Sequence, residues 1–256
     1  MSILASDGLI LRGTLTYPRG GAGKRSPLAV LAHQYPSTHE SFAPLTADLL
    51  ALGYATLAFD QRGHGKSTRL AGPNGVTESV INTPKGLTGQ DFADAFISSI
   101  GKVGFSHIAD DVVRVASWGA AQNFVDGGRI LLCGASVGGT GVLLAAPRLG
   151  VAVLGVLTLG AAAPLAHGEY GPSLIREQCR DARVPHLLTS SRDDAFDGAN
   201  NVRTWADGAP LVTPLIVGGD GHAMAIYFQV RMRVMAFARS VLKERKTPLK
   251  RPKKTR

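Results

Sequence analysis

The chain has little of what several protein classes depend on. Only 2 of its 256 residues are cysteine, which excludes a disulfide framework. No apolar run approaches the roughly 18 to 20 residues that a membrane-spanning helix needs. Charged residues make up 18% and aromatic residues 6%, while 45% of the residues are hydrophobic. This balance is typical of one large α/β domain, or at most two small ones, with ample apolar material for a single core.

The two cysteines and the first residues bear on the cellular compartment of the protein. Cys133 lies in an expected buried strand and Cys179 in an expected helix, and we interpret both as structural thiols. The opening stretch, MSILASDGLILRGTL, lacks a basic region followed by an apolar core, which a secretory signal would show. We therefore expect a cytoplasmic protein.

The net charge of +9 is concentrated at the carboxyl end. Residues 239–256 hold nine Lys or Arg and a single Glu, so eight of the nine net positive charges lie there. Two prolines interrupt KERKTPLKRPKKTR, residues 243–256, which predicts a disordered basic tail after a single domain spanning 1–242. A solvated tail is the simpler interpretation, and weak attraction to nucleic acid or anionic lipid is the alternative. We expect no specific nucleic-acid partner.

Apolar runs alternate with stretches of helical spacing along the chain. This pattern predicts a mostly parallel sheet with helices on both faces, preceded by one antiparallel strand. The expected strands are 9–17, 28–32, 54–59, 129–133, 151–159, 184–189 and 211–217, and the expected helices are 41–52, 106–121, 174–181, 200–205 and 223–243.

The segment 68–104 stands apart from this alternation. It contains two prolines, many glycines and few apolar repeats. Ligands of α/β sheets bind beyond the carboxyl ends of the strands. We expect this segment to be an insertion over that edge, where it would line the substrate entrance. We see no internal repeat and no spacing typical of metal ligands, and we expect no cofactor.

A Gly-x-Ser-x-Gly turn holds the candidate nucleophile. The stretch LLCGASVGG, residues 131–139, runs from an expected strand through this turn into a helix. Its small residues let the helix pack close to the strand. The hydroxyl of Ser136 is presented near the helix amino terminus, whose partial positive charge favours a developing anion. The alternative is an ordinary turn serine.

A serine nucleophile needs an adjacent base that is itself oriented by a carboxylate. The last two expected strands each run into a polar turn, SSRDD at 190–194 and GGDGH at 218–222. We predict Asp194 as the acid and His222 as the base. Both follow strands, so both belong at the same edge of the sheet as the serine.

Each of these two assignments has competitors. Asp193 and Asp197 compete with Asp194. Three of the other histidines are interpreted as surface or packing residues, and they are His39, His107 and His186. His167 follows a strand and is placed where it could line the pocket, although no motif surrounds it.

The order serine, aspartate, histidine is that of the α/β-hydrolase superfamily, and three further stretches resemble it. DQRGHGKS at 60–67 matches the superfamily's Asp-x-Arg-Gly-His-Gly-x-Ser turn. GGDGH at 218–222 resembles its glycine-flanked histidine turn, and HQY at 33–35 takes the place of its His-Gly-x loop. The resemblance extends from about residue 9 to residue 242.

The short connection from residue 159 to residue 184 leaves no room for a large cap. In this the chain is similar to the compact branch that includes dienelactone hydrolase and carboxylesterases. Dienelactone hydrolase uses a cysteine where this chain has Ser136, so its substrate is not carried over.

The resemblance implies roles for the matching residues. Ser136 would attack an acyl carbonyl, and His222 would take its proton and return it to the leaving group. Asp194 would hold the imidazole tautomer. The backbone N–H groups of Val137 and of Gln34 or Tyr35 would bind the oxyanion.

Four further residues match positions that support the site in the superfamily. His33 would brace the loop of the oxyanion hole, and His64 would belong to a structural turn. Asp60 and Arg62 would tie loops together by hydrogen bonds. Gln34 departs from the usual glycine, which leaves two alternatives: a different backbone at this position, or a side-chain amide that reaches into the site.

These residues predict a carboxylesterase that acts on small-molecule esters with small to medium acyl groups. A thioesterase or a peptidase would use the same three residues. A catalytically silent hydrolase fold that serves as a binding protein is the alternative from another class, because fold alone does not fix function. Nucleic-acid binding through the tail is a third hypothesis, and it would be salt-sensitive.

Overall fold

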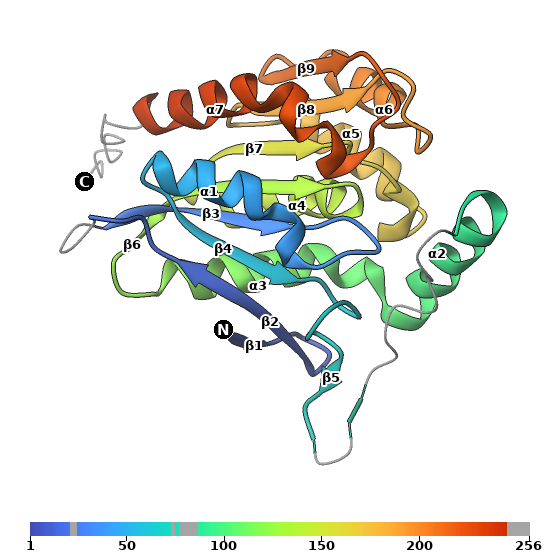
Figure 1. The fold of residues 1–256 in the computed structure, drawn as a ribbon, viewed down its shortest axis with the longest axis horizontal. Coiled ribbons are helices and arrows are strands. Elements are labelled where there is room, and N and C mark those ends of the chain that lie inside the picture. The colour runs from blue at the N-terminus through green and yellow to red at the C-terminus, as the bar shows by residue number, and fades with distance from the viewer. Residues whose placement is uncertain (21–24, 73–74, 77–86, 245–256) are drawn as a thin grey trace, which may run out of the picture.

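The apolar runs form the strands of one sheet, in the order β1-β2-β4-β3-β6-β7-β8-β9, with β5 beside β2 (Figure 1). The computed structural model describes residues 1–20, 25–72, 75–76 and 87–244. The strands are β1 (Ser2–Leu4), β2 (Leu9–Thr16), β3 (Ser26–Ala32), β4 (Ala55–Asp60), β5 (Arg69–Leu70), β6 (Val125–Ala135), β7 (Val153–Leu159), β8 (His186–Ser191) and β9 (Val212–Val217).

The central strands are parallel and the first ones are antiparallel, as the sequence predicts. β2 pairs antiparallel with β4, while β3, β4 and β6 to β9 run parallel to one another. Every residue of β3, β4 and β7 is buried. Such strands read as continuous apolar runs because helices cover both faces of the sheet.

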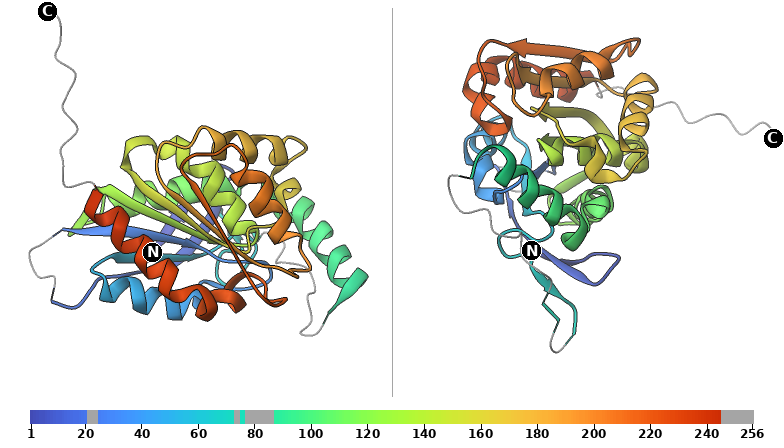
Figure 2. Two further views of the ribbon diagram at one scale, coloured as in Figure 1. Left: turned by 90° about the horizontal axis from the view of Figure 1, so that it is seen from above. Right: turned by 90° about the vertical axis from the view of Figure 1, so that its right-hand side faces the viewer.

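Two layers of helices enclose the sheet (Figure 2). Buried residues of α1 and α7 pack on one face, and those of α3, α4, α5 and α6 pack on the other. The helices are α1 (Ala43–Ala51), α2 (Gly89–Val103), α3 (Ile108–Ala120), α4 (Val137–Leu149), α5 (Gly171–Arg180), α6 (Gly198–Ala206) and α7 (Tyr227–Glu244). Five short 3₁₀ turns lie among the described elements, namely η1 (His39–Phe42), η2 (Phe105–His107), η3 (Gly150–Ala152), η4 (Pro164–His167) and η5 (Ala223–Ile226).

The topology places a switch point between β3 and β6. These strands are neighbours, and the chain leaves β3 toward β4 on one side and continues from β6 toward β7 on the other. Loops diverge at such a switch point, and ligands of doubly wound sheets bind outside the strand ends there. The loops after β3 and β6 carry HQY and Ser136, which explains why these distant motifs share one edge.

The segment 68–104 departs from the expectation of few apolar repeats, because its second half forms α2. Phe92, Phe96, Ile100 and Val103 form an apolar stripe that packs against the core. The helix ends at Gly104, whose φ of 73° is accessible to glycine and whose N–H donates to Ile100 O at 3.0 Å. Alanine, serine and glycine between the apolar residues hide this stripe in the sequence.

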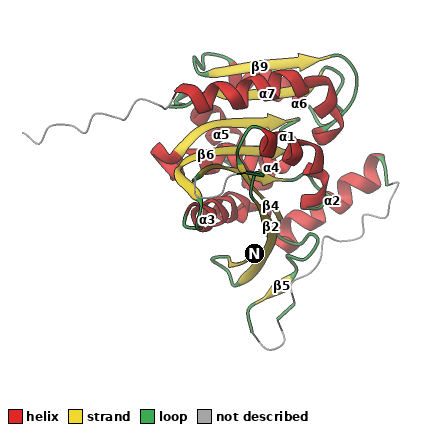
Figure 3. Ribbon diagram, turned by 60° about the vertical axis from the view of Figure 1, so that its left-hand side comes forward, coloured by secondary structure: helices red, strands yellow, loops and turns green. Residues whose placement is uncertain are grey.

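Helix α2 belongs to neither helix layer and lies beyond the carboxyl ends of the central strands (Figure 3). The expected basic tail lies outside the described residues from 245 onward. The last helix ends at Glu244, one residue beyond the expected helix end at Lys243 and inside the stretch expected as tail. Within the described ranges, no helix combines the length and the apolar character that a membrane crossing requires.

Candidate active site

Ser136 occupies a tight bend between β6 and α4. Its backbone angles are φ 51° and ψ −123°, a conformation that costs a non-glycine residue free energy and that surrounding contacts must hold. The Ser136 N–H donates to Leu159 O at 3.1 Å, and Ser136 O accepts from the amide of Ala162 at 3.3 Å. The bend is thus fixed from the neighbouring strand β7.

The glycines of the bend are required by close backbone contacts. A β carbon at Gly134 would collide with the carbonyl oxygen of Gly138, and one at Gly138 would collide with those of Ala32 and His33. A β carbon at Gly139 would lie 2.8 Å from the Ala161 side chain. The sequence-based argument for small residues at these three positions therefore has a direct steric basis. It also shows that the loop after β3 lies against the start of α4.

The structure brings Ser136, His222 and Asp194 together. His222 Nε2 lies 2.8 Å from Ser136 Oγ, and His222 Nδ1 lies 2.8 Å from Asp194 Oδ2. A carboxylate only accepts, so Nδ1 carries the hydrogen and Nε2 is free to accept from the serine hydroxyl. The Asp194 side chain is fully buried, whereas that of His222 is 17% exposed. This geometry allows proton transfer from the serine to the imidazole.

Of the three candidate acids, only Asp194 contacts the imidazole. Its other contacts are the hydroxyl of Ser190, which donates to Oδ2 at 3.1 Å, and the N–H of Phe196, which donates to Oδ1 at 2.9 Å. Asp193 is exposed, and its N–H donates to Gly219 O at 3.0 Å. Asp197 Oδ2 accepts from Asn200 Nδ2 at 3.2 Å near the start of α6.

His33 organises the loop after β3. The Gln61 N–H donates to His33 Nε2 at 2.9 Å, so the hydrogen of the ring is on Nδ1, which donates to Gln34 O at 2.7 Å. Burial lowers the pKa of His33 to about 4, which keeps the ring neutral at pH 7. The Gln61 side-chain amide also donates to His33 O. The carbonyl of Gln34 is thereby held, and with it the peptide unit that carries the Tyr35 N–H.

Val137 is the first residue of α4, directly after Ser136. The first amides of a helix have no partner within it, and their dipoles attract an anion. The Val137 N–H is the first of these amides, and it directly follows the candidate nucleophile. The side-chain Oε1 of Gln34 is buried and has no hydrogen-bond partner among the described residues.

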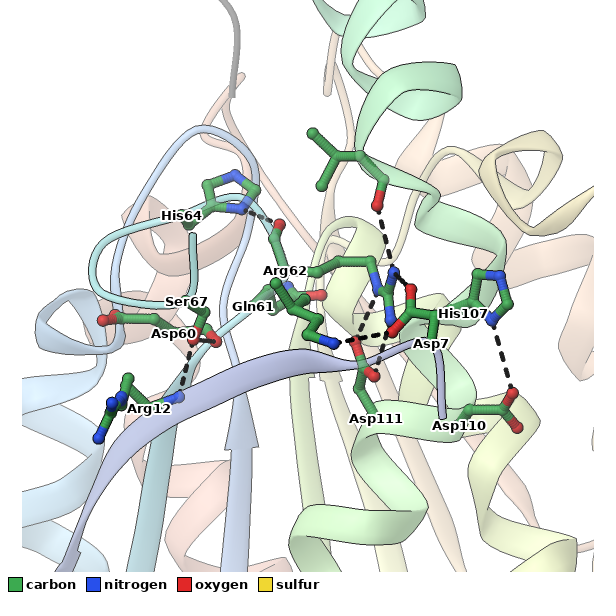
Figure 4. A network of polar contacts seen from close by, with 12 residues as sticks. Asp7, Arg12, Asp60, Gln61, Arg62, His64, Ser67, His107, Asp110 and Asp111 are labelled. Atoms are coloured by element: carbon green, nitrogen blue, oxygen red, sulfur yellow. Dashed lines mark hydrogen bonds and ion pairs between the residues drawn. The ribbon is translucent and has the colours of Figure 1, made fainter. Parts of the chain in front are cut away.

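The turn after β4, residues 60–67, is held by a buried network of polar contacts (Figure 4). Asp60 accepts from the backbone N–H groups of His39 and Lys66 at 3.0 and 2.9 Å. Arg62, only 1% exposed, forms a two-pronged contact with Asp111 at 2.7 and 3.0 Å and also contacts Asp7 at 2.8 Å. The expected loop-tying role of Asp60 and Arg62 agrees with these contacts. Since Gln61 lies between them, the network also fixes the partner of His33.

The remaining histidines take structural positions. His39 was expected at the surface or in packing, but its Nδ1 lies 2.7 Å from Asp60 Oδ1. His64 is buried, donates from Nδ1 to Arg62 O at 3.0 Å, and has a pKa lowered by burial to about 3. His186 is buried, and its Nδ1 lies 2.8 Å from Val184 O. His107 is 44% exposed and lies 3.8 Å from Asp110.

His167 and the cysteines do not join the three residues. His167 Nε2 lies 2.7 Å from the hydroxyl of Thr140 on α4, and burial lowers the pKa of the ring to about 4. Both cysteines are unpaired and buried, and burial raises the pKa of both thiols, which suits structural thiols. Across the described part of the chain, no group of three or more His, Cys, Asp or Glu side chains could hold a metal ion.

Aromatic residues that the sequence did not single out surround the site. The Phe196 ring lies 4.4 Å from the His222 ring between centroids, and Phe92 of α2 lies 5.6 Å from Phe196. Phe92 and Phe96 lie 5.7 and 5.0 Å from Tyr35, which follows Gln34. The one sequence feature that could have indicated an aromatic residue at the site is the position of Phe196, two residues after Asp194.

A cavity of about 500 Å³ opens beside the β4 turn, lined by residues that include Arg12, His39, Asp60 and Lys66. None of Ser136, Asp194 and His222 lines it. The cavity is therefore separate from these three side chains.

Residues 27–174, more than half of the chain, match the profile of the α/β hydrolase fold. The chain belongs to the α/β hydrolase fold family. A search of curated proteins gave no match.

Several solved structures are similar over nearly the whole chain. Est1E from Butyrivibrio proteoclasticus, with bound ferulic acid, is 17% identical with a TM-score of 0.67, over 95% of this chain and 98% of that one. Dienelactone hydrolase from Anabaena variabilis is 17% identical with a TM-score of 0.63, over 95% of each chain. An esterase from Rhodococcus is 17% identical with a TM-score of 0.60, over 95% and 98%. At this identity the likeness shows the fold.

Proposed function

We propose that this α/β hydrolase is a serine hydrolase that cleaves carboxylic esters with small to medium acyl groups. The observation that carries the proposal is the continuous chain of contacts from Ser136 through His222 to Asp194, with both distances at 2.8 Å. It lies at the switch point of the sheet, between the loops that follow β3 and β6. The esterases among the similar solved structures support the ester as the substrate class.

The proposed reaction passes through an acyl-enzyme. His222 takes the hydroxyl proton of Ser136 as the oxygen attacks the ester carbonyl, and the proton then goes to the departing alcohol oxygen. A water molecule next attacks the acyl-enzyme, His222 accepts its proton and returns it to Ser136 Oγ, and the acid leaves. Asp194 keeps the Nδ1–H tautomer throughout and stabilises the imidazolium.

The oxyanion of each tetrahedral intermediate would be bound by backbone amides. We propose the N–H of Val137 and that of Gln34 or Tyr35. A donor of this kind contributes roughly 3 to 4 kcal/mol to transition-state stabilisation. The hydrogen bonds of His33 support the second donor, because they hold the peptide before the reaction begins.

The test is hydrolysis of p-nitrophenyl acetate, butyrate and octanoate by the wild type and by Ser136→Ala. We expect a wild-type rate that falls by several orders of magnitude in the variant, because the remaining groups cannot form an acyl-enzyme. Ser240→Ala, on the exposed part of α7, is the matched control and should leave the rate unchanged. Matched thioester and amide substrates distinguish an esterase from a thioesterase or peptidase.

Fluorophosphonate labelling separates an enzyme from a binding protein. The wild type should become labelled at Ser136, and Ser136→Ala should not. A wild type that neither hydrolyses the esters nor reacts with the fluorophosphonate would overturn the proposal in favour of a silent hydrolase fold.

A further inference from the structure

Phe196 contacts both Asp194 and His222. It lies on the loop between β8 and α6, two residues after Asp194. Its backbone N–H donates to Asp194 Oδ1 at 2.9 Å, and its ring centroid lies 4.4 Å from that of His222, with the planes tilted by 44°. One residue thus holds the carboxylate through its backbone and the imidazole through its side chain.

Helix α2 supports the Phe196 ring from the other side. Phe92 lies 5.6 Å from Phe196 at an interplanar angle of 57°. The ring of Phe196 is not sheltered by the core, since the residue is 42% exposed. Phe92 is itself anchored on Tyr35 at 5.7 Å. A row of rings therefore leads from the loop after β3, across α2, to His222.

The physical reason for such a contact lies in the freedom of the imidazole. Hydrogen bonds at Nδ1 and Nε2 fix the two nitrogens only while both persist, and the ring edge is partly open to solvent at 17% exposure. A ring packed against the imidazole opposes its swing away from Ser136. Such an aromatic contact adds attraction beyond that of simple burial.

We propose that Phe196 is a positioning residue for His222, held in place by Phe92 of α2. The proposal rests on the proposed function, because it assigns Phe196 a role in the two proton transfers of His222. Phe196 acts through the imidazole in this proposal and does not itself exchange protons or bonds.

The experiment measures kcat and KM for p-nitrophenyl acetate in the wild type, Phe196→Ala and Phe196→Tyr. The acetyl ester is chosen because its small acyl group makes the fewest contacts with the walls. Because His222 acts in both acylation and deacylation, we expect kcat of Phe196→Ala to fall about 3- to 10-fold with KM within about twofold of the wild type. Phe196→Tyr keeps the ring and should retain most of kcat.

Two further variants test the link to α2. Phe92→Ala should also lower kcat, but less, and the effects of Phe92→Ala and Phe196→Ala should be less than additive in the double variant, because Phe92 acts in part through Phe196. Phe228→Ala is the matched control, since Phe228 is 70% exposed on α7 and should leave kcat unchanged. Melting temperatures identify any variant that loses the fold, and Phe196→Leu then replaces Phe196→Ala.

The rate of fluorophosphonate labelling distinguishes a failure of the proposed function from a failure of the positioning role of Phe196. A wild type that is neither labelled nor active overturns the proposed function, and this inference with it. A wild type that is active and labelled beside a Phe196→Ala variant of equal kcat and labelling rate overturns this inference alone. A variant with unchanged kcat and a raised KM would also overturn it, by making Phe196 a substrate wall.

Discussion

The β4 turn (residues 60–67) and helix α2 both reach the loop after β3, one through hydrogen bonds and the other through aromatic rings. Gln61 in the turn bonds His33 through both its backbone and its side chain. Phe92 and Phe96 of α2 pack on Tyr35, two residues further along the chain. The same short loop is thus held by two chemically different supports.

The two supports also differ in burial. Asp60, Arg62 and His64 of the turn are all at most 4% exposed, whereas Ile97 of α2 is 64% exposed and Phe92 is only half-buried. Buried hydrogen bonds fix direction as well as distance, and they leave a costly unsatisfied group when one partner is removed. Ring contacts have softer geometry and cost less to change. The turn therefore holds the loop after β3 more rigidly than α2 does.

Acid should have the largest effect, and it should act on the turn and on the loop after β3 that the turn holds. His33 and His64 have pKa values lowered by burial to about 4 and about 3, from 6.5 in the unfolded chain. Unfolded molecules therefore bind more protons below pH 6.5. The contribution of these two histidines to the free energy of unfolding should be complete above pH 6.5. It should decrease as the pH drops toward 4, by up to about 1.4 kcal/mol per pH unit for each histidine.

Urea unfolding between pH 7.5 and 4.5 measures this dependence. His64→Phe keeps an aromatic ring beside Phe105 but removes one titrating group, so its slope against pH should be smaller than that of the wild type. Residues 89–103 contain no histidine, so the histidine-dependent part of the slope does not come from α2. Equal slopes in the two proteins would show that His64 does not stay neutral in the fold.

Removing the charge of Arg62 should have the next largest effect. Arg62→Met leaves Asp111, 1% exposed, without its cation, and we expect the free energy of unfolding to fall by about 3 to 5 kcal/mol. The double variant Arg62→Met/Asp111→Leu should recover most of this loss, because no buried charge remains.

Arg148→Ala provides the matched control for Arg62. Its partner Asp110 lies 2.5 Å away, but the two side chains are 48% and 35% exposed, so the loss should stay below about 1 kcal/mol. Chemical denaturation of the four proteins checks the series. An Arg62→Met protein as stable as Arg148→Ala would refute the idea that burial makes the turn rigid.

Glycine substitutions should have the smallest effects, and Gly138→Ala and Gly101→Ala should change stability in opposite directions. Gly138→Ala forces a β carbon into the carbonyl oxygens of the loop after β3, so kcat should fall at least ~10-fold and stability by about 1 to 3 kcal/mol. Gly101→Ala on α2 meets no atom within 4 Å and should raise stability by about 0.5 to 1 kcal/mol with kcat unchanged. Ester hydrolysis and thermal unfolding measure both, and a loss of activity in Gly101→Ala would contradict the softer role of α2.

The sequence predicted the parts of the fold that local pattern determines. The fully buried runs that became β3, β4 and β7 were recognisable because only a strand covered on both faces reads as a continuous apolar run. The observed starts of α1, α3 and α7 differ from the expected ones because a 3₁₀ turn precedes each helix. In the sequence, the side-chain spacing of such a turn resembles that of the helix. The strands β1 and β5 were missed because they have three and two residues, and only pairing with β2 makes them strands.

The candidate site also has a part that the sequence predicted and a part that only the fold shows. Ser136, Asp194 and His222 were selected from the sequence because each stands in a turn after a strand, and parallel strands end at one edge. The choice of Asp194 over Asp193 rested on the family pattern, and only the fold shows which carboxylate reaches Nδ1 of His222. The contacts of Phe196, Phe92 and Tyr35 join three distant segments, and no local pattern carries such information.

The sequence by itself determined the class of fold, the nucleophile turn and the order of the three candidate residues, because strand periodicity, glycine spacing and chain order are local properties. The tertiary structure decided the tautomers of His33 and His222, the burial that keeps His33 and His64 neutral, and the position of α2 beside Phe196. These depend on which distant groups meet and on how much water remains between them. Both are set only when the whole chain is packed.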